Sequence, residues 1–85
     1  MIGECHLCGM WCNLERHHVF GAANRKHSER WGMVVDLCPT CHRTGRRSVH
    51  QSREAADRLK AEYQRLFELV HGHDEFMKIF GRNYL

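Results

Sequence analysis

Two adjacent histidines, His17 and His18, stand between two Cys-x-x-Cys elements in this chain. Neutral imidazole is a good ligand for a divalent transition metal, and a histidine pKa near ~6.5 also lets an uncoordinated ring take a proton at neutral pH. The pair therefore offers a metal ligand and a general base from one backbone segment. Neighbours on a regular strand point to opposite faces, so the alternative is one structural ring and one exposed ring.

The two Cys-x-x-Cys elements have the same spacing, with Cys5 and Cys8 in the first and Cys38 and Cys41 in the second. Each is typical of half a zinc ribbon, and in a reducing cytosol such pairs are zinc ligands more often than disulfides. We expect the four thiols to hold one structural zinc ion. The alternative is four unpaired buried thiols. The fifth cysteine, Cys12, is expected to be a small packing residue.

Local patterns predict the elements that must position these side chains. Residues 15–20 and Val34–Leu37 are each expected to form a short strand, and a polar, basic loop over residues 21–32 joins them. A helical segment is expected at Cys41–His42, directly after the second strand. The histidine pair and the second thiol pair would then lie on neighbouring strands.

A long helix is predicted after this region. Ser48 and Gln51 form a capping-box pattern at its start, and it ends near Gly72. Asp74 is predicted to cap a second, shorter helix that stops at Gly81. The long helix carries one apolar stripe, which consists of Val49, Ala56, Leu59, Tyr63, Leu66 and Val70.

With 85 residues the chain is near the size at which a hydrophobic core alone gives marginal stability. We predict a single α+β domain in which residues 1–50 form a zinc-stapled core and residues 51–85 form a helical hairpin packed on it. The first residues lack the basic and apolar regions of a signal peptide, and no apolar run approaches the ~18 residues of a membrane span. We therefore expect a cytoplasmic protein with no membrane partner.

The order of the motifs resembles the HNH endonucleases of the ββα-metal superfamily, in the version with a four-cysteine zinc. The resemblance lies in Cys-x-x-Cys, the histidine pair, a loop, and Cys-Pro-Thr-Cys-His at residues 38–42. It covers roughly residues 5–50. It implies a ββα-metal finger in which His17 and His42 bind the catalytic metal and His18 is the general base.

Two positions depart from the family pattern. Where the family often has a further helix histidine, this chain has Arg46, and we expect His50 to be the third ligand; the alternative is that His50 is an exposed side chain. The middle asparagine of the family is replaced by Trp-Gly-Met at residues 31–33. Asn24 is the candidate to take over its role, which is to pin the loop that orients the base histidine.

The expected function is that of a metal-dependent DNA endonuclease, a phosphodiester hydrolase of low sequence specificity. Its cofactors would be a structural zinc ion and a catalytic divalent metal: magnesium, manganese, nickel or zinc. The net charge of +3 is a mild bias, but the basic residues flank the Cys/His region. Contacts to DNA backbone phosphates are expected from Arg25, Lys26, Arg43, Arg46 and Arg47.

Residues 15–21 and 81–85 also resemble small HNH-like proteins encoded by phages and prophages. That resemblance implies DNA processing in the cytoplasm of a phage-infected or prophage-bearing bacterial cell, with a homodimer or a phage protein as a further partner. Two other functions stay open: a non-catalytic zinc module that binds nucleic acid or protein, and a phage regulatory or inhibitory protein with this fold. A binding module needs only the cysteine zinc, whereas the nuclease needs a second ion.

Overall fold

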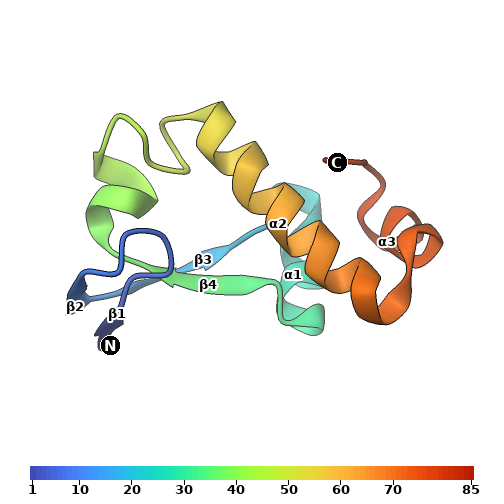
Figure 1. The fold of residues 1–85 in the computed structure, drawn as a ribbon, viewed down its shortest axis with the longest axis horizontal. Helices are drawn as coiled ribbons and strands as arrows, with labels where there is room; N and C mark the ends of the chain where they lie inside the picture. Colours follow the sequence, from blue (N-terminus) through green and yellow to red (C-terminus); the bar gives the residue numbers. More distant parts are fainter.

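The computed structural model describes all 85 residues, and it confirms the α+β class. Two small antiparallel sheets lie beside three α-helices and two short helical turns (Figure 1). None of the helices combines the length and the apolar composition that a membrane crossing requires. In chain order the elements are β1 (Ile2–Glu4), β2 (Trp11–Asn13), β3 (Glu15–His18), η1 (Ala22–Asn24), α1 (Arg25–Trp31), β4 (Val34–Leu37), η2 (Thr40–Thr44), α2 (Arg53–His71) and α3 (His73–Phe80).

The β3–β4 sheet carries the histidine pair. Its register places His17 opposite Val35 and His18 opposite Val34. Strand β4 has the predicted bounds, but β3 ends earlier than the predicted strand over residues 15–20. The chain leaves the ladder because Phe20 turns into the core, where its ring is buried and its backbone bonds to a side chain of α1.

The β1–β2 hairpin is an element that the sequence pattern does not predict, because three residues are too few to show an alternation. Its two strands bracket the first Cys-x-x-Cys element. Two backbone hydrogen bonds close the turn at its end: Cys5 N–H donates to the Met10 carbonyl at 2.9 Å, and Gly9 N–H donates to the Cys5 carbonyl at 2.9 Å. The hairpin thus fixes the backbone that presents the first two thiols.

The segment between β3 and β4 differs from the predicted loop, because η1 and α1 make most of it helical. Helix α1 ends at Gly32, whose φ of 71° is a left-handed conformation that glycine adopts without strain. Ser28 anchors this helix. Its fully buried hydroxyl donates to the Phe20 carbonyl at 2.7 Å and accepts from the Phe20 N–H at 3.0 Å.

Ser28→Ala is expected to lower the free energy of unfolding by about 1–3 kcal/mol, because it leaves the buried N–H and C=O of Phe20 without a partner. Chemical denaturation followed by circular dichroism would measure the change. Lys26→Ala, an exposed substitution on the same helix, is the matched control and should change stability by no more than about 0.5 kcal/mol. Equal stability of the two variants would contradict the anchoring role of Ser28.

Helix α2 begins at Arg53, later than the capping-box pattern predicts. Its N-cap is Ser52, whose side chain accepts a hydrogen bond from the backbone N–H three residues later at 3.2 Å. Ser48 instead accepts from Gln51 N–H at 3.1 Å in a separate turn before the helix. Extended backbone at Ser52 separates the Ser48 turn from α2. His50 therefore lies in the Ser48 turn and not in the first turn of α2.

The apolar stripe predicted for α2 is wrong at its C-terminal end. Leu66 and Val70 are 48% and 77% exposed, whereas Leu59 and Phe67 are buried. Phe67, one residue after Leu66, faces the core instead, because α3 packs against that side of α2. Phe67 lies 5.7 Å, centroid to centroid, from the ring of Phe76 in a cluster of aromatic residues that also contains Phe20 and Phe80.

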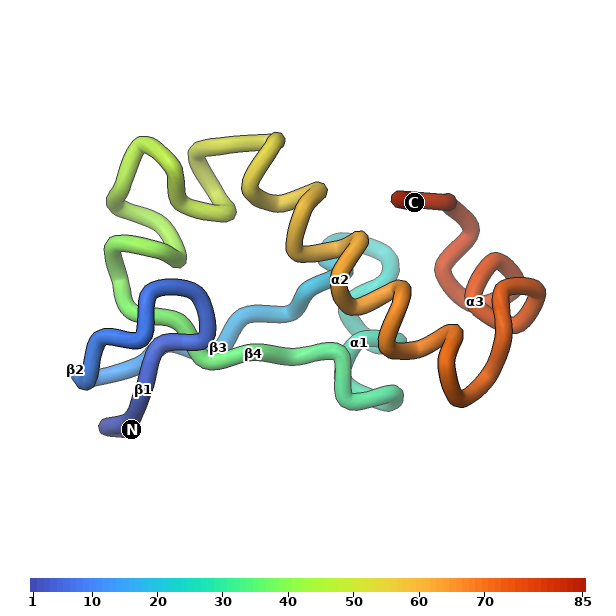
Figure 2. The backbone as a smooth tube through the Cα atoms, in the orientation of Figure 1, coloured from blue at the N-terminus to red at the C-terminus, as the bar shows by residue number.

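The residues after α3 fold back toward α2, as the tube in Figure 2 shows. Fully buried Gln64 holds them: its Nε2 donates to Asn83 Oδ1 and its Oε1 accepts from Tyr84 N–H, each at 2.7 Å. Tyr84 thereby packs on the core. At the other end of α3 the N-cap is Gly72, and Asp74 lies in the first turn, so the prediction that Asp74 caps this helix is wrong.

Candidate metal centres and the histidine cleft

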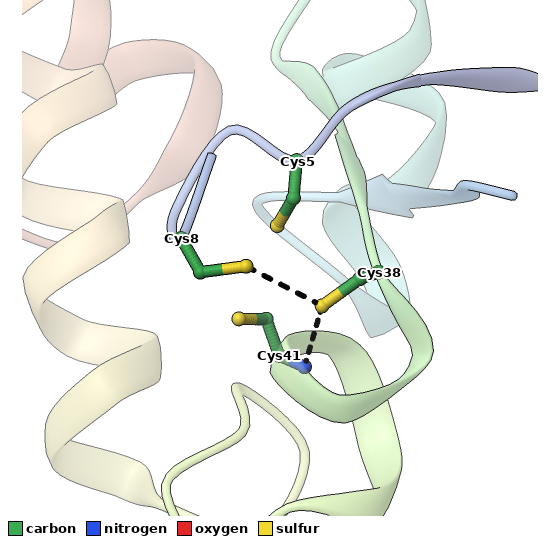
Figure 3. Close-up of side chains that lie close together, drawn as sticks. All are labelled: Cys5, Cys8, Cys38 and Cys41. Carbon is green, nitrogen blue, oxygen red and sulfur yellow. Dashed lines mark hydrogen bonds between the residues drawn. The ribbon is translucent and has the colours of Figure 1, made fainter. Parts of the chain in front are cut away.

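Four thiols from two segments that are distant in the sequence lie close together in the fold (Figure 3). Cys5 and Cys8 belong to the hairpin turn, whereas Cys38 follows β4 and Cys41 lies on η2. All four sulfur atoms lie within 4.8 Å of one another, and the Sγ atoms of Cys8 and Cys38 are 3.7 Å apart. Four sulfurs bound tetrahedrally at ~2.3 Å from zinc would be about 3.8 Å apart. The cluster can therefore hold a metal ion such as zinc.

The thiol cluster also has the electrostatics of a metal site. Cys41 N–H donates to Cys38 Sγ at 3.3 Å. Burial raises the pKa of Cys5, but backbone N–H groups, that of Cys38 foremost, outweigh it and lower the pKa to about 6. Burial raises the pKa of Cys41, so the thiols do not all ionise without a cation, and a metal must displace protons on binding. Cys12 lies outside this group.

Three histidines form a second cluster. His17 on β3, His42 on η2 and His50 in the turn before α2 offer ring nitrogens that all lie within 4.8 Å of one another. The Nε2 atoms of His42 and His50 are 3.1 Å apart. Two imidazole nitrogens bound to one ion at ~2.0–2.1 Å would be roughly 2.9–3.4 Å apart. The three rings therefore fit a single metal ion.

Backbone geometry brings His50 to His42. The N–H of His50 donates to the carbonyl of His42 at 3.2 Å, so the turn after η2 folds back on η2 itself. Gly45 makes this reversal possible, because a Cβ atom there would lie 2.7 Å from the backbone carbonyl oxygen of Thr40. The tight loop thus places His50, four residues after Arg46 in the sequence, beside His42.

Glu15 is a site residue that the sequence reasoning missed. The Nδ1 of His42 donates to Glu15 Oε1 at 2.8 Å, and Arg43 makes an ion pair with the same carboxylate at 2.9 Å. The hydrogen bonds from Arg43 and His42 lower the pKa of Glu15 to about 2. A carboxylate that accepts the proton of Nδ1 leaves the Nε2 lone pair of His42 free for a metal. Arg43, expected among the phosphate contacts, is engaged with Glu15.

Burial above all, and then positive charge on His42 and His50, lower the pKa of His17 from 6.5 to about 4. Between pH 4 and pH 6.5, His17 therefore binds a proton in the unfolded chain but not in the folded chain. The free energy of unfolding falls as the pH drops from 6.5 toward 4. In protein without a metal ion at the histidine cluster, we expect the ring of His17 to be neutral at pH 5.5. Nitrogen NMR of the ring would show this, and a protonated ring at that pH would contradict it.

His18 has a different partner. Its Nε2 lies 2.5 Å from Glu29 Oε2 on α1, and Arg16 holds the other oxygen of Glu29 at 2.6 Å. The bonds to His18 and then to Arg16 lower the pKa of Glu29. Asn24, the residue expected to help orient the base histidine, donates instead to the carbonyl of Phe80 at 3.0 Å and ties η1 to α3. Asn24 therefore pins η1 to α3, and the hydrogen-bond partner of the His18 ring is Glu29.

One open cleft of about 650 Å³ is lined both by the three clustered histidines and by His18. Both His17 and His18 line it, although they are neighbours on a strand. Cationic side chains border the cleft, among them Lys60 on α2. The sequence alone does not show which side of α2 faces the cleft, so Lys60 was not predicted to lie there. Lys26 lines an adjoining groove, and Arg46 and Arg47 are exposed outside both. The basic residues of the cleft are Arg16, Arg25 and Lys60.

Comparison of the chain with protein-family models, with curated proteins and with solved structures finds no match. The resemblance to HNH endonucleases therefore depends on the motifs in the chain itself. The function has to be inferred from what these side chains can do together.

Proposed function

We propose that this protein is a metal-dependent endonuclease of the HNH type, which hydrolyses phosphodiester bonds in DNA. One observation carries the proposal: three histidines that can share one metal ion lie in the same cleft as His18, which is hydrogen-bonded to a carboxylate and is not part of the metal cluster. A ligand set next to an uncoordinated base is the minimum that this hydrolysis needs. A structural zinc site alone would require neither.

His17, His42 and His50 would hold the divalent ion. Once bound, the ion supplies positive charge that stabilises the charge developing on the phosphate in the transition state. Three imidazole nitrogens favour zinc or nickel over magnesium, which prefers oxygen ligands. The Glu15 carboxylate keeps the ring of His42 in the orientation and tautomer that such a ligand requires.

His18 is the proposed general base. With its Nε2 proton donated to Glu29, the Nδ1 lone pair is free to take a proton from the attacking water. The water oxygen forms a new bond to phosphorus, the bond from phosphorus to the leaving ester oxygen breaks, and that oxygen takes up a proton from solvent. The reaction needs no oxidant or second substrate.

The substrate proposed for the cleft is the DNA backbone. Arg25 and Lys60 border the cleft and pair with no carboxylate, so both are free to contact phosphates. Phosphate contacts position a duplex without reading its sequence. Low sequence specificity follows, and the processing of phage or prophage DNA is the setting that we propose.

His42→Ala is expected to reduce the metal content of the protein from two ions to one per chain, because it removes a histidine ligand and leaves the four thiols intact. Metal analysis after dialysis against zinc would measure the change. His71→Ala is the matched control, since His71 is exposed at the end of α2 and belongs to neither cluster. Two ions in His42→Ala would contradict the proposed histidine site.

The activity itself is tested with supercoiled plasmid. Purified protein is incubated with zinc, nickel, manganese or magnesium, or with a chelator, beside His42→Ala and His71→Ala. We expect metal-dependent nicking by the wild type and His71→Ala and little by His42→Ala. Absence of nicking with every metal, in a protein that holds its zinc and binds DNA, would overturn the nuclease in favour of the non-catalytic binding module.

A further inference from the structure

We infer that Glu29 is a positioning residue, which fixes the ring orientation and the tautomer of His18 so that Nδ1 faces the cleft as a proton acceptor. This role rests on the proposed function, because it concerns the residue proposed as general base. It is not implied by the HNH resemblance, in which a pinned loop backbone carries out this task.

The geometry requires one tautomer. An ionised carboxylate can only accept hydrogen bonds, so the proton of a neutral His18 ring must be on Nε2, which lies 2.5 Å from Glu29 Oε2. The Nδ1 atom then carries the lone pair. The side chain of His18 is 16% exposed, whereas that of Glu29 is 52% exposed, so solvent reaches the carboxylate more readily than the ring.

Glu29 is itself held from two directions. Arg16, on the same strand as His18, binds its other oxygen at 2.6 Å. On the chain, Glu29 directly follows Ser28, whose buried hydroxyl is bonded to both backbone groups of Phe20. Ser28 therefore fastens α1 to Phe20, just after β3, and Glu29 fastens it to His18, the last residue of β3. This fixes the rotation of α1 that points Glu29 at the ring.

A second carboxylate, that of Glu15, supports the assignment by contrast. Glu15 binds the Nδ1 side of His42 and leaves its Nε2 toward the metal cluster, whereas Glu29 binds the Nε2 side of His18 and leaves its Nδ1. The two carboxylates thus select opposite tautomers of two histidines in one cleft. One ring is set for metal binding and the other for proton transfer.

The test is long-range proton–nitrogen NMR of the histidine rings in the zinc-loaded protein, with plasmid nicking measured beside it. We expect His18 to be a single Nε2–H tautomer in the wild type and a mixture in Glu29→Gln, whose amide can both donate and accept. Nicking by Glu29→Gln should fall about 10–100-fold at unchanged metal content. Glu62→Gln, which alters the carboxylate paired with His6 outside the cleft, is the matched control.

The two readouts separate the possible failures. An unchanged His18 tautomer in both Glu29→Gln and Glu29→Ala would overturn the positioning role, whether or not the protein cleaves DNA. A tautomer that depends on Glu29, in a wild-type protein that does not nick plasmid with any metal, would support the positioning role while overturning the nuclease. Loss of metal from Glu29→Gln would also overturn the positioning role, because Glu29 would then act on the metal site.

Discussion

Cys38→Ala is expected to release the metal from the four-thiol cluster and to unfold residues 1–50. Cys38 is buried, and its sulfur is 3.7 Å from Cys8 Sγ and accepts the N–H of Cys41. A structural zinc ion contributes on the order of 10 kcal/mol of apparent binding free energy, whereas a core of this size supplies roughly 3–5 kcal/mol. Zinc analysis and thermal unfolding by circular dichroism would measure the loss.

Cys12→Ala is the matched control, since Cys12 is a partly buried thiol on β2, in the hairpin that carries Cys5 and Cys8, and lies outside the four-thiol group. It should keep its zinc and unfold at nearly the wild-type temperature. If Cys38→Ala showed the zinc content and midpoint of the wild type, the four-thiol metal site would be refuted.

His18→Ala is expected to lower the rate of plasmid nicking by about 10²–10⁴-fold, the usual contribution of a general base, while the protein keeps two metal ions. The fold should survive, because the side chain of His18 lies at the border of the cleft and outside the buried core. Initial rates of conversion of supercoiled to nicked plasmid, at saturating metal, would measure the effect.

The comparison of His18→Ala with His42→Ala separates the two roles. Both variants should be slow, but only His42→Ala should lose an ion. His71→Ala again serves as the control for removing a histidine as such. A His18→Ala protein that nicks plasmid at the wild-type rate would remove His18 from the proposed mechanism.

Sequence reasoning was most successful where the signal is local or repeated. Strand β4, in which three of four residues are apolar, has the predicted bounds, and α2 ends where glycine follows it. The two Cys-x-x-Cys elements match in spacing, and their thiols do gather in the fold. The expectation of a metal staple came from chain length, because 85 residues cannot bury a large core.

Features that depend on how elements pack could not be predicted in the same way. Glu29 reaches His18 only because residues 25–31 form a helix, and its buried anchor Ser28 gives no periodic signal. Two serines were both suitable N-caps, and the backbone at Ser52 decided between them. Leu66 and Phe67 are equally apolar, so the face of α2 that is buried was set by where α3 lies.

The adjacency of Cys41 and His42 on η2 has a consequence for the protein as a whole. One residue belongs to the thiol cluster and the next to the histidine cluster, so a single rigid turn is shared by both sites. An ion bound at the thiols would restrain the backbone of His42, which is proposed to bind the second ion. By thermodynamic reciprocity, occupancy of either site would then raise the affinity of the other. A protein with both ions bound would in this sense be a cooperative receptor, in which the supply of one metal would govern the loading of the other.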